Sequence, residues 1–378
     1  MNELKKTYLF DFHNANGAKF VPFAGYSMPV QYKSGVISEH LHTRNKVGFF
    51  DVSHMGQIKI WSKNNNREEL IQNLERLIPS DLINLKENRQ TYSFFTNENG
   101  GVIDDLMIAN KGPYFHLVVN ASQKKEDFKH LKDNLSTFCN VELEENKSLI
   151  AIQGPKSENI LSNLNSKINS MNFMDVFDIS FFDFKCSVSR SGYTGEDGFE
   201  ISVENKNVYK LVETIFKNTD LLPIGLGARD SLRLEAGLCL YGNDLDPKIT
   251  PVEANLNWAI HKRRRNQNDI DLNFLGNKKI LKQLKDGPEC IRIGLMPIGK
   301  APMRAGNYIY QDVEGKKEIG VITSGGYSPT LKQPISMGRI KTIDLKNIEK
   351  VFVRIRDNIL PAKICKLPFI QTKYKIRG

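Results

Sequence analysis

The residues best suited to chemistry lie in the stretch Asn97–Asn110, where two adjacent aspartates interrupt a run of strand-forming residues. Asparagines and glycines at its start favour a tight turn. Alternate residues of a strand face opposite sides, so Asp104 and Asp105 should point apart, each among apolar neighbours. A buried carboxylate must be hydrogen-bonded or paired. Each aspartate therefore either accepts hydrogen bonds from the nearby turn or points into a cavity and meets a polar ligand, and a dyad sharing one proton is not expected.

A second candidate group is an expected helix in the second half of the chain that carries two arginines. Arg229 and Arg233 are four residues apart and so share one helical face. Arginines in an otherwise apolar helix need carboxylate or ligand partners, and an internal ion pair and a ligand contact are equally open here. The candidate protein partners are Glu200, Asp230 and Glu235.

Three other patterns indicate structure more than chemistry. His40 and His42 are two residues apart on an expected helix, a spacing that does not put both on one face and so disfavours a metal pair. Ser53 precedes His54, but no nucleophile-elbow pattern surrounds the serine. Three glycines in Gly192–Gly198 indicate a sharp turn or a close approach of another group, and the phosphate-loop pattern is missing.

The composition is that of a soluble globular protein with several domains. The chain has 378 residues, of which 40% are hydrophobic and 25% charged. Its five dispersed cysteines contain no C-x-x-C pair, which argues against a disulfide framework and a zinc site. The N-terminus has neither the apolar run of a secretory signal nor a convincing transit peptide, and no apolar run is long enough to span a bilayer. We therefore expect a cytoplasmic protein without a membrane partner.

The net charge of +10 raises the question of nucleic-acid binding. The densest basic cluster, Lys262–Arg265, has no interleaved aromatic residues, and the other lysines are scattered. This pattern disfavours a nucleic-acid partner. A small polyanionic ligand or an acidic protein partner fits the positive charge equally well.

The elements that must position these side chains are predicted from hydrophobic periodicity. Strand and helix patterns over about 55–137 predict one compact α+β unit. Strands at 187–190 and 199–203 predict a hairpin around the glycine-rich loop. The polar, Asn- and Lys-rich segment 242–280 is expected to be a connection. From residue 289 onward, short strand patterns between Gly and Pro turns predict a small β-barrel.

Several motifs together resemble the aminomethyltransferase, or T-protein, family of the glycine cleavage system. They extend over essentially the whole chain, and their order and spacing make the resemblance specific. The motifs are Phe23-Ala-Gly-Tyr-Ser-Met-Pro29, Phe50-Asp-Val-Ser-His-Met55, Asn97–Leu106, Gly192-Tyr-Thr-Gly-Glu-Asp-Gly-Phe-Glu200, Gly227–Asp244, Thr250-Pro-Val-Glu253, Ala301-Pro-Met-Arg304 and Thr323-Ser-Gly-Gly-Tyr-Ser-Pro-Thr330. Tyr26 is one departure, because the family commonly has Trp there, but both are large amphipathic aromatics.

The resemblance implies an α+β fold with three domains in a cloverleaf around a central folate channel. The implied domains are a split first domain (1–52 plus 138–250), a ferredoxin-like second domain (53–137), and a linker with a C-terminal β-barrel (251–378). Tetrahydrofolate would be the one-carbon acceptor, no metal would be needed, and the partner would be lipoylated H-protein. Its aminomethyl-dihydrolipoyl arm would yield methylene-tetrahydrofolate, ammonia and the dihydrolipoyl arm. The alternatives are a related folate-dependent demethylase of a small methylated compound and a non-catalytic folate-binding protein.

The resemblance also implies roles for single residues. Asp105 matches the family's catalytic aspartate, while Glu200 and Arg229 match residues that hydrogen-bond the pterin. A carboxylate can accept from the aminopterin edge, and a guanidinium can donate to its carbonyl. The other implied substrate or folate contacts are Tyr374, Asn120, Tyr92 and Met55. Arg233 and Asp104 are left as structural residues, the latter serving the turn or the domain core.

Overall fold

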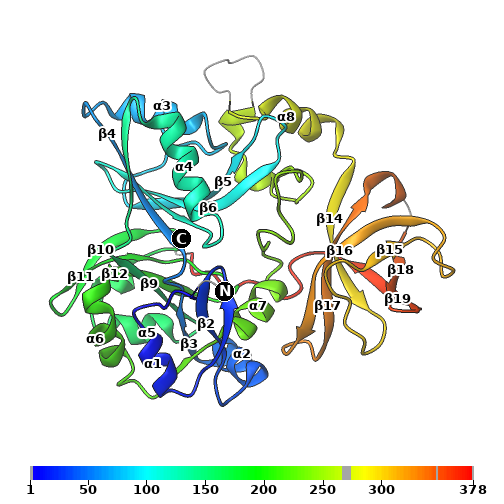
Figure 1. The fold of residues 1–378 in the computed structure, drawn as a ribbon, viewed down its shortest axis with the longest axis horizontal. Helices are drawn as coiled ribbons and strands as arrows, with labels where there is room; N and C mark the ends of the chain where they lie inside the picture. The colour runs from blue at the N-terminus through cyan, green and yellow to red at the C-terminus, as the bar shows by residue number, and fades with distance from the viewer. Residues whose placement is uncertain (1–2, 266–273, 346–347, 377–378) are drawn as a thin grey trace.

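The structure, a computed structural model, describes residues 3–265, 274–345 and 348–376. It has three lobes, with a mixed α+β first lobe, a second α+β lobe above it in the view, and a β-barrel to one side (Figure 1). Among the described residues, the strands of the sheets pair antiparallel apart from one parallel pair, β13 with β3. This arrangement confirms the expected α+β fold with a C-terminal barrel.

The first lobe is built on a six-stranded sheet in the order β10-β11-β12-β9-β3-β13, with a separate hairpin, β1-β2. Its strands are β1 (Lys19–Phe23), β2 (Tyr26–Gln31), β3 (Val47–Asp51), β9 (Lys147–Gln153), β10 (Val176–Phe181), β11 (Phe184–Ser189), β12 (Gly198–Glu204) and β13 (Leu221–Pro223). Its helices are α1 (Phe10–Ala15), α2 (Val36–Asn45), α5 (Ser157–Ser162), α6 (Asn205–Ile215) and α7 (Leu226–Glu235).

Both faces of this sheet are covered, because its central strands are apolar at consecutive positions. On β3, Phe49 joins a core that includes side chains of α1, α5 and α6, whereas Phe50 joins a core that includes side chains of α7. On β9, Ile150 and Leu149 divide in the same way. Packing on the second face fixes α7, the helix with the two arginines, against the sheet.

The second lobe is a five-stranded sheet in the order β5-β6-β7-β4-β8. Its elements are β4 (Gly56–Ser62), α3 (Arg67–Glu75), β5 (Arg89–Thr96), β6 (Val102–Asn110), β7 (Phe115–Val119), α4 (Lys124–Leu135) and β8 (Cys139–Leu143). Leu106 and Ile108 of β6 enter a core that includes side chains of both helices. Because β8 pairs with β4, a strand beyond the expected boundary at residue 137 lies in this sheet, and we propose to extend the second domain through β8.

The segment expected to be a polar connection contributes to a core instead. Leu245, Ile249, Val252, Leu256 and other apolar residues of this segment pack with side chains of β5 and β6. Helix α8 (Asn277–Asp286) follows, and its residue Ile280 joins the same cluster. These apolar side chains lie on mostly irregular backbone before α8, so they have neither the period of a strand nor that of a helix.

The barrel closes in the order β14-β17-β16-β15-β18-β19. Its strands are β14 (Cys290–Pro297), β15 (Tyr308–Tyr310), β16 (Glu318–Ser328), β17 (Gln333–Lys341), β18 (Lys350–Ile355) and β19 (Asn358–Cys365). After β19 the chain turns back and runs between the other two lobes (Figure 1). This C-terminal tail, from Lys366 on, therefore reaches the centre of the molecule. In the described part of the chain no helix is long and apolar enough to cross a membrane.

Candidate active site

The seven expected site residues lie around one cavity of about 1300 Å³. Its walls come from all three lobes and from the C-terminal tail. The lining includes Met55, Tyr92, Asp105, Asn120, Glu200, Arg229 and Tyr374. A volume of this size exceeds the usual range for a pocket that holds one small ligand, so it has room for a second reactant.

Asp105 lies on the cavity side of β6 and is held by two donors. The Tyr92 hydroxyl on neighbouring β5 donates to Oδ2 at 3.0 Å, and the Asn120 side-chain amide donates to Oδ1 at 2.8 Å. Burial, reinforced by the nearby charge of Asp104, raises the pKa of Asp105 to about 7, although both hydrogen bonds oppose the shift. Asp105 is thus a carboxylate that can gain or lose a proton near neutral pH, the property expected of an acid–base group.

Asp104 faces the opposite side of β6, as strand alternation predicts, and is fully buried. It accepts from the backbone N–H of Asn120 at 3.0 Å and from the Asn120 side-chain amide at 2.9 Å. The turn before β6 is held by another residue, since the side chain of Asn97 accepts from the backbone of Asn99 and Gly101. Asp104 therefore serves the core and the end of β7, not the turn.

Glu200 and Arg229 lie on the wall that the first lobe contributes. Glu200, on β12, accepts from the Ser191 hydroxyl at 2.8 Å. Arg229, on α7, lies over the ring of Tyr193, 4.8 Å from its centroid. The structure gives the Arg229 guanidinium no ion pair with a described carboxylate, and burial lowers its pKa. A desolvated cation beside a carboxylate fits recognition of a planar polar ligand edge.

The neighbouring arginine of α7 has the structural role that the sequence suggested for it. Arg233 is buried and pairs with Asp230 at 2.8 Å and with Asp244 at 3.0 Å. Glu235, which the sequence also offered as a partner, pairs instead with Arg44 at 2.9 Å. One arginine of the motif thus faces the cavity, while the other joins an internal ion pair.

Tyr374 reaches the cavity from the C-terminal tail. Its ring stacks on Phe173 with centroids 4.3 Å apart and planes 14° apart. The backbone N–H of Phe173 donates to the carbonyl of Lys375 at 3.0 Å, which ties the tail to the first lobe. A flat aromatic pair at the wall is suited to contact a planar ring.

Sequence reasoning missed several aromatic residues of the cavity lining, among them Trp258 and Tyr193. Trp258, in the segment taken for a connection, is 63% exposed and stacks on Tyr92 with centroids 5.2 Å apart. Tyr193 lies beneath Arg229 and donates its hydroxyl to the carbonyl of Cys239. Trp258 is one of two tryptophans in the chain and lies in a polar stretch. This feature of the sequence could have marked it as a candidate site residue.

His40, His42 and Ser53 have structural contacts, whereas His54 lines the cavity. Both ring nitrogens of His40 bond to protein groups, and His42 contacts the carbonyl of Asp220 at 2.7 Å. The Ser53 hydroxyl donates to a backbone carbonyl on β9. Ser231, His40 and Glu235 resemble a hydrolytic triad, but none of the three lines the cavity. The described residues contain no cluster of three metal-ligating side chains, and the five cysteines are free.

Three of the four residues in the basic run also have structural contacts, and Arg265 donates to the backbone carbonyls of Asn257 and Ile260. Arg263 pairs with Glu75 and with Asp81, and Arg264 pairs with Glu75 at 2.9 Å. These ion pairs fasten the segment after the first lobe to α3 and the loop that follows it. Much of the run's charge is therefore neutralised within the protein.

Two protein-family models match most of this chain. A family model described as the GCVT N-terminal domain matches residues 9–264, and one described as the glycine cleavage T-protein C-terminal barrel domain matches residues 292–371. The chain belongs to the glycine cleavage T-protein family. The mitochondrial aminomethyltransferase of Dictyostelium discoideum is 46% identical over 99% of this chain and 94% of its own length. A probable mitochondrial aminomethyltransferase of Schizosaccharomyces pombe is 42% identical over 99% and 95%.

A solved structure extends the likeness to three dimensions. The glycine cleavage system aminomethyltransferase T from Bartonella henselae has a TM-score of 0.90 and 38% identity, over 99% of this T-protein and all of that chain. The function expected from the resemblance, an aminomethyltransferase of the glycine cleavage system, is thereby confirmed. Neither the small-molecule demethylase nor the non-catalytic folate binder is favoured.

The expected cytoplasmic location is wrong. Similar curated aminomethyltransferases, including those of Dictyostelium discoideum and Flaveria pringlei, are named as mitochondrial. The expectation rested on reading the N-terminal residues for a secretory signal and a transit peptide, and such a reading does not decide between the cytosol and the mitochondrial interior.

Proposed function

We propose that this T-protein takes the methylene carbon from the aminomethyl-dihydrolipoyl arm of H-protein and gives it to tetrahydrofolate, with Asp105 as the catalytic carboxylate. In the balanced reaction, the carbon loses its bonds to sulfur and to the amino nitrogen and gains bonds to two folate nitrogens. The two protons that leave the folate nitrogens are accounted for by ammonia and by the free thiol. No oxidant, reductant or metal enters this balance.

The observation that carries the proposal is the environment of the Asp105 carboxylate. A folate ring nitrogen that attacks carbon becomes cationic, and a carboxylate nearby stabilises that charge and can accept the proton. Tyr92 and Asn120 fix both oxygens of Asp105, so the group needs little rearrangement during the reaction. Its pKa near 7 supplies both protonation states at neutral pH.

We assign recognition of the folate to the wall that the first lobe contributes. Glu200 would accept N–H groups of the aminopterin edge, and Arg229 would donate to its carbonyl. Both belong to the wall of the first lobe that joins β12 and α7. Tyr374 and Met55 line the same cavity and would contact the ring faces. Trp258, which is exposed and stacked on Tyr92, would cover the ligand from the side of the second lobe.

The test is the reconstituted reaction with lipoylated, aminomethyl-loaded H-protein and tetrahydrofolate, in which the formation of methylene-tetrahydrofolate is measured. Asp105→Asn keeps the size of the side chain but removes the negative charge and the proton acceptor, so turnover should fall by about 10²–10⁴-fold. Asp133→Asn, on the exposed surface of α4, is the matched control and should be fully active. A folded Asp105→Asn protein with wild-type turnover would refute the assignment.

A further inference from the structure

The C-terminal tail that carries Tyr374 is held by a buried charge network that the proposed chemistry does not use. We propose that Arg44 and Glu196 are positioning residues that hold this tail in the conformation that binds folate. The identity of the ligand rests on the proposed function. The connection between the network and the cavity wall rests on the contacts described below.

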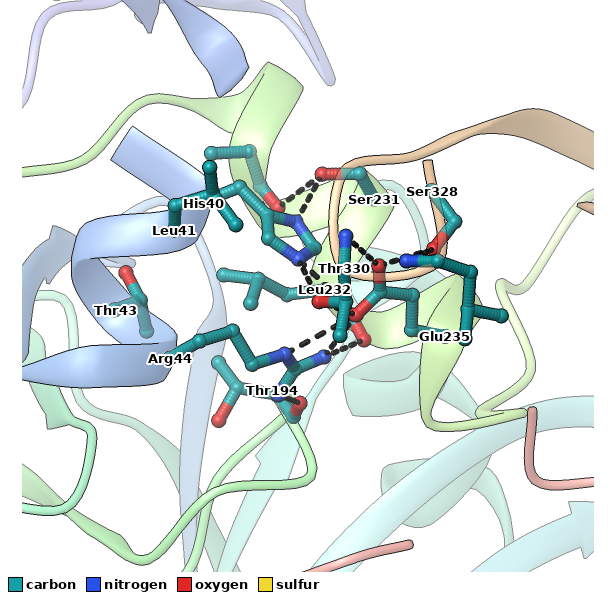
Figure 2. A network of polar contacts seen from close by, with 12 residues as sticks. His40, Leu41, Thr43, Arg44, Thr194, Ser231, Leu232, Glu235, Ser328 and Thr330 are labelled. Carbon is teal, nitrogen blue, oxygen red and sulfur yellow. Dashed lines mark hydrogen bonds and ion pairs between the residues drawn. The ribbon is translucent and has the colours of Figure 1, made fainter. Parts of the chain in front are cut away.

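The network centres on the carboxylate of Glu235, which is fully buried at the end of α7. Figure 2 shows the side chains that converge on it from α2 and from the barrel. His40 and Arg44 approach from α2, at 3.0 Å and 2.9 Å. Thr330, in the connection between β16 and β17 of the barrel, donates through its backbone N–H at 3.0 Å. One carboxylate therefore fastens the barrel to the first lobe.

The tail is attached to this same point through the main chain. The backbone N–H groups of Phe369 and Ile370 donate to the carbonyl of Glu235, at 3.0 Å and 3.2 Å. Further along, the N–H of Lys373 donates to the carbonyl of Gly195 at 2.8 Å. The tail thus lies across the end of α7 and across the glycine-rich loop that precedes β12.

Arg44 joins Glu235 to that loop. Its guanidinium donates to Glu235, and also donates to the carbonyl of Thr194 at 2.6 Å and to Glu196 at 3.1 Å. Glu196 is 1% exposed and accepts from Lys373 of the tail through the same oxygen, at 3.1 Å. Arg44 and Glu196 thereby form a chain of charges from the node at Glu235 to the residue next to Tyr374.

The position of Tyr374 explains why this chain concerns ligand binding. Its ring is at the cavity wall, and both Arg44 and Glu196 are close enough to influence the pKa of its hydroxyl, which burial raises. Gly195 has φ +79°, and a Cβ at this position would lie 2.8 Å from the Cβ of Ala236, so the loop fits closely against the end of α7. Loop, helix end and tail therefore form one packed unit.

Because the loop, the end of α7 and the tail pack together, the tail is ordered before a ligand binds. When the tail is fixed before binding, the ligand does not have to offset the entropy of ordering it. Loss of the Glu196 charge should therefore weaken folate binding more than it slows the chemical step at Asp105, which lies on another wall. A role confined to folding would instead lower the melting temperature and leave the folate affinity of the folded protein unchanged.

The experiment measures tetrahydrofolate affinity by calorimetry in the full-length protein, alongside KM and kcat in the reconstituted reaction. For Glu196→Gln we expect Kd and KM to rise about tenfold, which corresponds to about 1.4 kcal/mol, while kcat changes less than twofold. Because the effect should pass through Tyr374, Glu196→Gln should change Kd little when it is introduced into a Tyr374→Ala protein.

A second variant covers the case in which Glu196→Gln folds poorly. Lys373 has a side chain 58% exposed, and Lys373→Met removes the tail's half of the ion pair while Arg44 and Glu196 remain paired. Its effect on Kd should be about two- to threefold and should shrink in high salt, as expected of a partly exposed pair. The matched control is Asp220→Asn, in the same lobe, because Asp220 pairs with Lys46 and Lys156 and not with the tail. It should lower stability without altering Kd.

The results separate this inference from the proposed function. If the wild-type protein binds tetrahydrofolate and the Glu196→Gln and Lys373→Met proteins bind it equally well, the positioning role is wrong and the function stands. The positioning role is also wrong if Glu196→Gln has its full effect in the Tyr374→Ala background. If the wild-type protein neither binds tetrahydrofolate nor turns it over, the proposed function itself fails.

Discussion

Replacing Tyr92 by Phe provides a quantitative test of the environment of Asp105. The change removes one hydrogen bond, from the Tyr92 hydroxyl to Oδ2 at 3.0 Å, and keeps the ring that stacks on Trp258. A hydrogen bond to a charged group contributes about 1.5–3 kcal/mol. At about 1.36 kcal/mol for each pKa unit, its loss should raise the pKa of Asp105 by about one to two units.

The consequence is a displaced pH profile. With the pKa of Asp105 at about 7 in the wild-type protein, half of the carboxyl groups are ionised at that pH. In the Tyr92→Phe protein the ionised fraction at pH 7 should fall to about a tenth or less, by the same shift of one to two units. The rate should therefore drop by about fivefold or more at pH 7 and should recover as the pH approaches 9.

The assay is single-turnover transfer from aminomethyl-loaded H-protein, measured from pH 6 to 9 with saturating tetrahydrofolate. Tyr193→Phe is the control, because it removes a cavity hydroxyl that bonds to a backbone carbonyl and not to Asp105. It should leave the midpoint of the profile in place, whatever its effect on the rate. A Tyr92→Phe rate that is reduced equally at every pH would show that the hydroxyl does not act through the ionisation of Asp105.

Three further predictions concern the buried charges of Asp104, Asp105 and Arg233. Asp104→Asn should move the midpoint of the pH profile downward, opposite to Tyr92→Phe, because the charge of Asp104 raises the pKa of Asp105; an unchanged midpoint would contradict this coupling. Burial raises the pKa of Asp105 from 3.8 to about 7, so its contribution to stability is greatest below pH 4 and is lost as the pH rises through 7. Asp105→Asn should therefore be more stable than wild type at pH 8, by at most about 4 kcal/mol, and the difference should vanish near pH 4 in thermal unfolding. Arg233→Met breaks the buried pair with Asp244 and should lower the free energy of unfolding by about 3–5 kcal/mol in urea titrations; a loss below 1 kcal/mol would mean that the hydrogen bonds from Thr323 and Ser324 suffice to stabilise the Asp244 carboxylate.

The sequence predicted the parts of the fold that follow a regular period. Alternation along β6 placed Asp104 and Asp105 on opposite faces, and the structure has them so. The segment after α7 was misread as a polar connection, because its apolar residues are spaced irregularly before α8 and pack against another lobe. Local pattern cannot reveal a partner that is distant in the chain.

The site was less predictable than the strands, for a related reason. The resemblance supplied seven cavity residues, but not the contacts that hold them. The node at Glu235 joins α2, α7, the barrel and the tail, and its partner Thr330 lies 95 residues further along the chain. Glu235 was offered as a partner for Arg229 or Arg233, whereas the structure pairs it with Arg44. Charge pairing depends on the folded arrangement, which sequence spacing does not encode.

Asn120 shows why the two aspartates of β6 are chemically linked although they face opposite ways. It follows the last residue of β7, where the pairing with β6 ends, so its side chain can reach residues on both faces of β6. Its side-chain nitrogen donates to Asp104 at 2.9 Å and to Asp105 at 2.8 Å. A proton gained by either carboxyl therefore changes the hydrogen bond available to the other, and the charge of Asp104 adds to the effect of burial on the pKa of Asp105.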